Sequence, residues 1–236
     1  MIKLQDVAKA YQTPAGNFHA LKNISVSIDH NEFLCIVGKS GAGKTTFLNM
    51  ITGVDSISNG EVHVNGTSVH TMPEDQLALW RGLNLGIIYQ SFELMPMLTL
   101  MENVMLPMDF CHLYSRKKSR ERARELLRMV ELEDHMDKLP NAISGGQQQR
   151  VAIARALAND PPVIVADEPT GRLDSTTAET ILDIFEKLVK EGKTVVMVTH
   201  DASAAQRATR VLQIVDGEIQ SNNTGNLLMK SIVSTN

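Results

Sequence analysis

The chain has 236 residues, of which 43% are hydrophobic, so it can form one large α/β domain or two small ones with a substantial core, and disorder is not expected. Its formal net charge is −4. A protein with general affinity for nucleic acid or for an anionic membrane is expected to carry an excess of basic residues, so the charge indicates neither property. The two cysteines, Cys35 and Cys111, lack metal-ligand spacing, which favours a reduced, cytoplasmic setting.

The first ninety or so residues alternate short apolar runs with turn residues. Residues 24–28 (ISVSI) have a period of two, and residues 60–66 (GEVHVNG) read as a strand that enters a turn. We therefore predict an antiparallel β subdomain here. Residues 1–31 mix charged residues with single apolar ones, and this mixture does not indicate an export signal.

A complete phosphate-binding loop lies between the apolar run 33–37 and a helical pattern at 46–51. Its glycines let successive N–H groups point at phosphate oxygens, the helix N-terminus adds a favourable dipole, and Lys44 adds a positive charge. A nucleoside triphosphate is therefore the first ligand to consider, with a ligand-free glycine-rich turn as the alternative. The phosphate-binding candidates are Gly38, Lys39, Ser40, Gly41, Ala42, Gly43, Lys44, Thr45 and Thr46, and the Thr45 hydroxyl is also a candidate magnesium ligand.

From about residue 91 to residue 159 the pattern becomes helical, most clearly at 119–131, where Leu126, Leu127 and Val130 share one face. This segment predicts a helical subdomain inserted into the nucleotide-binding core. Its most apolar part, 92–110, is broken by charged residues and prolines and cannot cross a bilayer as a clean helix. If a membrane matters to the function, another chain must span it.

Two stretches of this segment allow two interpretations each. Residues 91–104 are rich in methionine, whose flexible thioethers suit a groove that accepts a helix from a partner, although most of these methionines are expected to fill the subdomain core. The basic run 116–124 could contact nucleic acid. Interleaved glutamates and the lack of aromatic residues favour a solvated helix face instead.

Residues 163–166 and 194–198 are continuous apolar runs separated by a helical stretch at 176–191, a pattern typical of a buried parallel sheet. Asp167 and Glu168 follow the first run. Beside the phosphate loop, Asp167 can lie next to magnesium, usually through water, and Glu168 can polarise an attacking water. Without the phosphate loop, two acids capping a strand end in solvent would be the default interpretation.

A second phosphate cradle is indicated at Ser144, Gly145 and Gly146, which precede a helical pattern at 147–158 and so place free N–H groups at a helix N-terminus. An ordinary serine N-cap would leave the two glycines unexplained. The stretch 142–150 (AISGGQQQR) resembles the signature sequence of ATP-binding-cassette (ABC) ATPases and of no other phosphate-loop family.

The resemblance covers residues 2 to about 220 and extends to further positions in the expected order. It implies that Tyr11 stacks on adenine, that Gln90 binds magnesium and senses the subdomain, and that His200 holds the γ-phosphate, Glu168 and water in place. Tyr11 could instead be a core aromatic, Gln90 a surface glutamine, and His200 a structural group with satisfied hydrogen bonds. Within residues 171–174 (GRLD), Asp174 matches the dimer-contact position, and Gln147 belongs to the signature cradle.

The implied fold is an α/β phosphate-loop NTPase core, a mostly parallel sheet with helices on both faces, with an antiparallel β subdomain and an inserted α-helical subdomain. We expect one ABC ATPase domain at 1–220, the helical subdomain at about 91–159, and a C-terminal tail at 221–236, whose polar beginning suggests poor order.

The resemblance also implies ATP and Mg²⁺ as cofactors and a head-to-tail dimer. Because one copy cannot use both cradles on one nucleotide, the Ser144 loop of one copy would close over the γ-phosphate held by Lys44 of the other. Separate integral membrane permease subunits would hold the protein at the inner face of the membrane, with no nucleic-acid partner. Several segments, including 94–96 (LMP) and 167–171 (DEPTG), look like the lipoprotein-release and macrolide-efflux group (LolD-like and MacB-like).

Two residues depart from the family pattern. Ile143 replaces the usual leucine, a change that should leave the polar donors of the loop untouched. Arg172 stands where a small or neutral residue is commoner, and it could alter the pairing of two copies.

A cassette ATPase acting on a soluble nucleic-acid or ribosome assembly is the alternative function, although such relatives usually carry a long coiled-coil insertion or two cassettes in one chain. An unrelated phosphate-loop kinase or GTPase is disfavoured by the signature.

Overall fold

The apolar runs of the sequence lie side by side in a six-stranded sheet, in the order β10-β9-β3-β8-β7-β6. Strands β9, β3, β8, β7 and β6 run parallel, and β10 is antiparallel to β9. The computed structural model describes residues 2–14 and 16–224. The strands are β3 (Phe33–Val37), β6 (Leu85–Ile88), β7 (Val163–Asp167), β8 (Thr194–Val198), β9 (Arg210–Val215) and β10 (Glu218–Thr224).

Side chains of the central strands alternate between two hydrophobic cores, because successive residues of a strand point to opposite faces. In β3, Leu34 and Ile36 belong to the core that also contains helix α1 (Lys44–Thr52). Cys35 belongs to the core on the other face, and burial raises the pKa of its thiol to about 12. The sheet is thus covered on both sides, which is why its strands read as continuous apolar runs.

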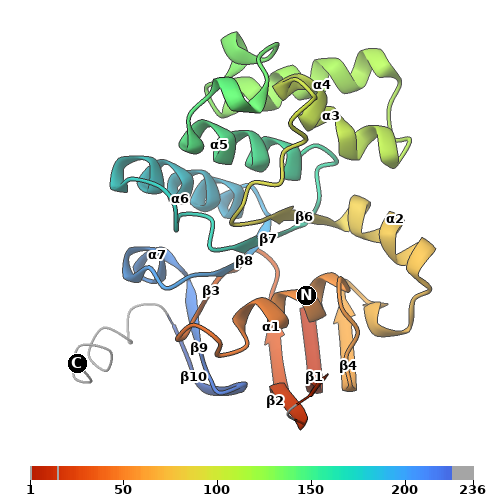
Figure 1. The fold of residues 1–236 in the computed structure, drawn as a ribbon, viewed down its shortest axis with the longest axis vertical. Helices are drawn as coiled ribbons and strands as arrows, with labels where there is room; N and C mark the ends of the chain where they lie inside the picture. The colour runs from red at the N-terminus through yellow and green to blue at the C-terminus, as the bar shows by residue number, and fades with distance from the viewer. Residues whose placement is uncertain (1, 15, 225–236) are drawn as a thin grey trace.

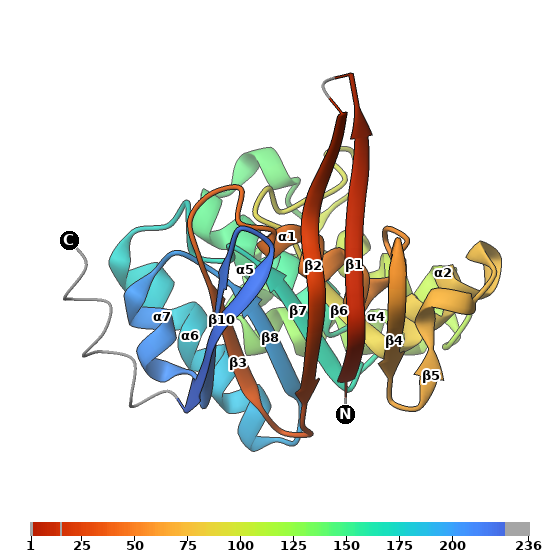
Figure 2. The same cartoon turned by 90° about the horizontal axis from the view of Figure 1, so that it is seen from below.

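A second sheet has four strands in the order β2-β1-β4-β5 and is antiparallel throughout. Its members are β1 (Ile2–Thr13), β2 (Gly16–Ile28), β4 (Asn59–Val64) and β5 (Thr67–Ser68). The hairpin of β1 and β2 extends beyond the rest of the molecule (Figure 2). Because α1 packs between the two sheets, the antiparallel sheet holds the phosphate loop from the side opposite the parallel strands.

The helices α3 (Leu100–Phe110), α4 (Arg116–Met129) and α5 (Gly145–Ala156) all fall within residues 91–159 and stack at the end of the molecule away from the antiparallel sheet (Figure 1). Short 3-10 turns lie between α4 and α5 at Glu133–His135 and Pro140–Ala142, and a third lies after β5 at Val69–Thr71. The fold class predicted from the sequence is confirmed by this arrangement of sheets and helices.

Helix α2 (Glu74–Asn84) lies in the part of the chain that the sequence predicted to contain antiparallel strands. Leu77 is the one buried residue of this helix, so α2 lies on the surface and contributes little to the core. The start of this helix could have been predicted from the local sequence. Glu74 and Asp75 follow Pro73, and acidic residues favour the first turn of a helix. Strand β10 continues to Thr224, past the predicted domain boundary at 220. The predicted tail otherwise lies outside the described residues.

The methionine-rich segment divides into buried and exposed members. Within residues 91–104, Met101 is buried in the subdomain core, whereas Met95 and Met97 are 47% and 84% exposed, so the expectation that most of these methionines fill the core is wrong. Met105 and Met108, which follow the segment on α3, are buried. The buried Asn103 fixes the loop that carries the exposed pair, since its Oδ1 accepts from the Met95 N–H at 2.7 Å and its Nδ2 donates to the Met95 and Leu98 carbonyls.

Helix α4 carries most of the basic run on a solvated surface. It buries Ser119, Ala123, Leu126 and Leu127 against the subdomain core and leaves its lysines exposed. Arg128 pairs with Glu133 at 2.7 Å, as expected for a charged outer face. Among the described residues, no helix is both long and apolar enough to cross a bilayer.

Helices α6 (Ser175–Lys190) and α7 (Ala202–Arg207) are joined by an ion-pair cluster. Arg207 contacts three carboxylates of α6, those of Glu179, Asp183 and Glu186. The side chain of Arg207 is only 20% exposed, so these contacts are partly shielded from solvent. The cluster ties the segment that follows His200 to the helix that follows Asp174.

Candidate nucleotide-binding site

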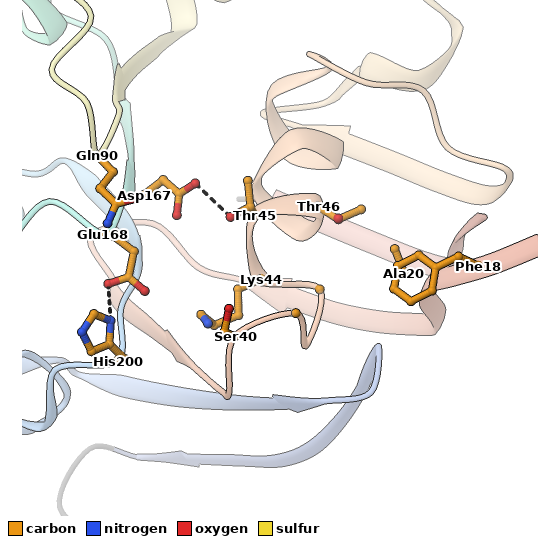
Figure 3. A pocket seen from close by; sticks show the side chains of 12 residues that line it. Phe18, Ala20, Ser40, Lys44, Thr45, Thr46, Gln90, Asp167, Glu168 and His200 are labelled. Atoms are coloured by element: carbon orange, nitrogen blue, oxygen red, sulfur yellow. Dashed lines mark hydrogen bonds and ion pairs between the residues drawn. The ribbon is translucent and has the colours of Figure 1, made fainter. Parts of the chain in front are cut away.

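A cavity of about 630 Å³ opens at the carboxyl ends of β3 and β7, where the phosphate loop meets the two acids (Figure 3). Such an edge of a parallel sheet is the usual place for ligands in α/β proteins. It brings together residues that are far apart in the sequence, and its walls are formed by Phe18, Ala20, Ser40, Gly41, Gly43, Lys44, Thr45, Thr46, Gln90, Asp167, Glu168 and His200.

The phosphate loop has the tight backbone that its glycines allow. Gly43 is the N-cap of α1 with φ of 103°, and a Cβ there would lie 2.4 Å from the Ala20 carbonyl oxygen, so only glycine fits. Lys44 Nζ donates to the carbonyls of Gly38 at 2.9 Å and Lys39 at 3.1 Å. The ammonium group is therefore held inside the curve of the loop, facing the cavity.

Two oxygen ligands suited to a hard cation meet on one wall of the cavity. Thr45 Oγ1 donates to Asp167 Oδ2 at 3.0 Å, and Gln90 contributes an amide beside them (Figure 3). Burial, together with the nearby charge of Glu168, raises the pKa of Asp167, although the Thr45 hydroxyl acts in the opposite direction. An added positive charge at this point would stabilise the ionised carboxylate.

Glu168 and His200 form a contact next to Asp167 and Gln90, on the side of the cavity that faces the phosphate loop (Figure 3). His200 Nδ1 lies 2.7 Å from Glu168 Oε2, within ion-pair distance. Glu168 is 14% exposed and His200 is 67% exposed. The Glu168 backbone is left-handed, with φ of 48°, although its N–H still pairs with the Val198 carbonyl at 2.9 Å. This non-glycine residue is held in a costly conformation, as often occurs at functional sites.

Tyr11, predicted to stack on adenine, lies beside the cavity rather than on its wall. Its hydroxyl donates to Asp55 Oδ2 at 2.8 Å, and Lys9 Nζ lies 4.9 Å from the ring centroid. Phe18 is directly opposite Tyr11 in the β1–β2 hairpin, is 54% exposed, and does line the cavity. Sequence reasoning missed Phe18. Pairing the strands across the turn at Pro14 to Gly16 would have placed it beside Tyr11.

The second cradle lies outside this cavity. Ser144 caps α5 through a capping box, in which its Oγ accepts from the Gln147 N–H at 3.3 Å and Gln147 Oε1 accepts from the Ser144 N–H at 2.9 Å. Ser144 and Gly145 are exposed. Neither they nor Gly146 and Gln147 line the cavity that contains Lys44.

Asp174 also does not line the cavity, and it caps α6. Its carboxylate accepts from the Thr177 N–H at 3.0 Å and from the Thr177 hydroxyl at 2.7 Å, and these bonds lower the pKa of Asp174. Gly146 packs against Thr177, since a Cβ on Gly146 would lie 2.7 Å from Thr177 Cγ2. The two capped helix starts are therefore neighbours on one exposed surface.

The sheet order, the phosphate loop and the acids at the end of β7 define the chain as a phosphate-loop nucleotide-binding protein. A protein-family model described as ABC transporter matches residues 21–171. The chain belongs to the ABC transporter family as an ATP-binding cassette, and the prediction of an ABC ATPase is confirmed.

Similar proteins cover nearly the whole chain. The ABC transporter ATP-binding protein MJ0796 of Methanocaldococcus jannaschii is 46% identical over 93% of this chain and 95% of its own length. A dimeric structure of that cassette bound to ADP and Pi matches with a TM-score of 0.90 and 44% identity over 95% of this chain and 98% of the other. The macrolide export ATP-binding/permease protein MacB of Syntrophobacter fumaroxidans is 42% identical over 93% of this chain but only 31% of its own length.

Proposed function

We propose that this cassette is the ATP-hydrolysing subunit of an ABC transporter or mechanotransmission complex, and that two copies pair head to tail around two ATP molecules. The observation that carries the proposal is the separation of the two phosphate cradles. Lys44 faces the cavity, whereas Ser144 and Gly145 are exposed outside it on the same chain. A second copy would bring its own Ser144 loop to the open side of this cavity. The dimeric structure of the MJ0796 cassette supports this arrangement.

Magnesium fits the wall formed by Thr45, Gln90 and Asp167. Hydroxyl, amide and carboxylate oxygens are the ligand types that Mg²⁺ prefers, and the Thr45–Asp167 contact of 3.0 Å already places two of them together. Bound there with ATP, the ion would neutralise phosphate charge. We expect it to be needed for hydrolysis.

The positions of the other cavity residues suggest a separate role for each in ATP hydrolysis. The phosphate loop holds the triphosphate through N–H groups and Lys44, and Glu168 polarises the attacking water from the side of the cavity that faces the loop. His200 orients Glu168 through the 2.7 Å contact and stands close enough to the cavity to bond the γ-phosphate. The strained backbone of Glu168 gives its carboxylate a fixed direction.

The nucleobase would rest against the aromatic pair of the β1–β2 hairpin, and we expect Phe18 to supply the exposed ring. Phe18→Ala should weaken ATP binding about threefold to tenfold, because aromatic stacking contributes roughly 0.5–1.5 kcal/mol. Tripolyphosphate, which has no base, should bind equally well to the variant and to the wild type. Titration calorimetry with both ligands checks this.

Tyr11→Phe is the matched control, since it keeps the ring and removes only the hydroxyl bound to Asp55. It should change ATP affinity less than Phe18→Ala does. Equal losses for ATP and tripolyphosphate in Phe18→Ala would show that the substitution disturbs the phosphate loop instead.

A membrane partner is supported by an exposed surface of the helical subdomain. Met95 and Met97 are exposed, and a groove of about 420 Å³ is lined by Leu98, Glu102, Met105, Leu106, Asp109 and Arg116. A groove that combines aliphatic and thioether side chains with charged ones suits an amphipathic helix of a partner protein. MacB, which is named as both ATP-binding protein and permease, is longer than this cassette and supports a permease as the partner. We place the cassette at the cytoplasmic face of the membrane through that permease.

Affinity purification from detergent-solubilised cells tests the membrane assignment. The wild-type cassette should recover an integral membrane protein, and Met97→Asp should recover less of it while hydrolysing ATP normally. Recovery of soluble ribonucleoprotein or DNA complexes alone would favour the alternative function, an ABC ATPase that acts on a soluble assembly.

A further inference from the structure

The turn that follows Gln90 has an unusual backbone. Phe92 and Glu93 are consecutive non-glycine residues with φ of 62° and 50°. Left-handed geometry costs such residues roughly 1–2 kcal/mol each, so the surrounding structure must hold them. Local bonds supply part of this support, because the Glu93 N–H donates to the Ser91 carbonyl at 2.6 Å and the Ser91 hydroxyl contacts the Glu93 carboxylate.

Arg155 supplies the rest from a distant part of the chain. Its guanidinium donates one hydrogen bond to the Phe92 carbonyl at 2.8 Å and another to the Glu93 carbonyl. One rigid fork thus holds both left-handed residues at once, which a lysine could not do with the same geometry. Burial lowers the pKa of Arg155, so its charge is kept at a desolvation cost that backbone carbonyls partly offset.

The helix that carries Arg155 is α5, the helix whose N-terminus is the exposed phosphate cradle. Arg155 lies near its C-terminal end, and Ser144 caps its other end. The Phe92 ring also reaches back toward the cradle, since a Cβ on Gly145 would lie 3.9 Å from it. The turn after Gln90 therefore lies close to both ends of α5, at Gly145 and at Arg155, which are roughly 15 Å apart at 1.5 Å per residue.

We infer that Arg155 is a positioning residue that makes the turn after Gln90 and the Ser144 cradle move as one body. Gln90 lines the cavity that contains Lys44, so a ligand there acts on the turn directly. Through Arg155 the displacement reaches α5 and reorients the cradle, which serves the nucleotide of the second copy. This inference rests on the proposed dimer for its role, but the coupling itself lies within one chain.

Hydrogen–deuterium exchange on the isolated cassette, at a concentration too low for pairing, tests the coupling without a dimer. In the wild type, ATP with magnesium should slow exchange at residues 38–46 and also change exchange at 144–149. In Arg155→Met the change at 38–46 should persist and the change at 144–149 should disappear. Arg155→Lys should restore only part of it.

Arg150→Met is the control, because Arg150 lies on the same helix and also donates to a carbonyl outside it, that of Val130 at 3.0 Å, but does not reach the turn. It should keep both exchange changes. The inference is wrong if Arg155→Met keeps the change at 144–149, or if Arg150→Met loses it equally.

A second measurement connects the coupling to pairing. In a Glu168→Gln background, Arg155→Met should raise the ATP concentration needed for dimer formation about tenfold or more, while the ATP affinity of the monomer stays within twofold. An equal loss in both quantities would indicate a merely structural role. If Glu168→Gln alone forms no dimer, the proposed dimer fails, whereas the exchange result within one chain still decides the coupling.

Discussion

Glu168→Gln should lower the rate of ATP hydrolysis about 10²- to 10⁴-fold, which is the usual contribution of a general base. The amide keeps the size of the side chain and its place beside His200, whose Nδ1 lies 2.7 Å from the carboxylate in the wild type, but it cannot take a proton from water. The phosphate loop and the Ser144 cradle are untouched, so ATP should bind and hold two copies together. Phosphate release measures the first effect, and size-exclusion chromatography with light scattering measures the second.

Glu125→Gln is a suitable control for this experiment, since Glu125 is an exposed carboxylate on α4 far from the cavity. It should hydrolyse ATP like the wild type and should not accumulate as a dimer. Near-normal ATP hydrolysis by Glu168→Gln would show that Glu168 is not the general base. If Glu168→Gln stays monomeric in the presence of ATP and magnesium, the proposal that two copies share each nucleotide site is contradicted.

Mixing two inactive variants should restore hydrolysis if each site is built from two copies. Lys44→Ala removes the ammonium group from the cavity, and Gly145→Asp aims a carboxylate at the phosphate expected from the other copy. Each variant alone should lose about 100-fold or more in activity, because a charge-assisted contact is lost or a like charge is added at the phosphate. In an equimolar mixture half of the dimers are mixed, and one of the two sites in each is intact, so about a quarter of wild-type activity should return.

Gly145→Asp is chosen because the fold tolerates it. A Cβ on Gly145 would only touch the Phe92 ring at 3.9 Å, whereas a Cβ on Gly146 would collide with Thr177 at 2.7 Å. An aspartate in the first turn of α5 should also stabilise that helix by roughly 0.3–1 kcal/mol. Thermal unfolding should therefore show a protein at least as stable as the wild type. If the mixture remains inactive while both variants fold, each site is built within one copy.

The sequence predicted the parallel core well because its strands are buried on both faces. Runs such as 33–37 and 163–167 contain almost no polar residues, and their identity as strands did not depend on subtle periodicity. The convergence of the candidate phosphate and metal residues on one cavity was also predictable, since they follow these strands directly and the strand ends meet at one edge.

Features that depend on pairing between distant segments were not predictable in the same way. Phe18 lines the cavity because β1 and β2 pair in a register that places it opposite Tyr11, and no motif marks it. The two hydrogen bonds from Arg155 reach the carbonyls of Glu93 and Phe92, which lie 62 and 63 residues earlier in the chain. Neither residue stands out from its local sequence, so only the folded chain identifies them.

The left-handed backbone of Glu168 places this protein under two opposing demands. A glycine would adopt that geometry without strain and would yield a more durable fold, but it would lack the carboxylate that we propose activates water. Laboratory selection for heat resistance alone should therefore drift away from glutamate at this position and yield robust cassettes that no longer turn over ATP.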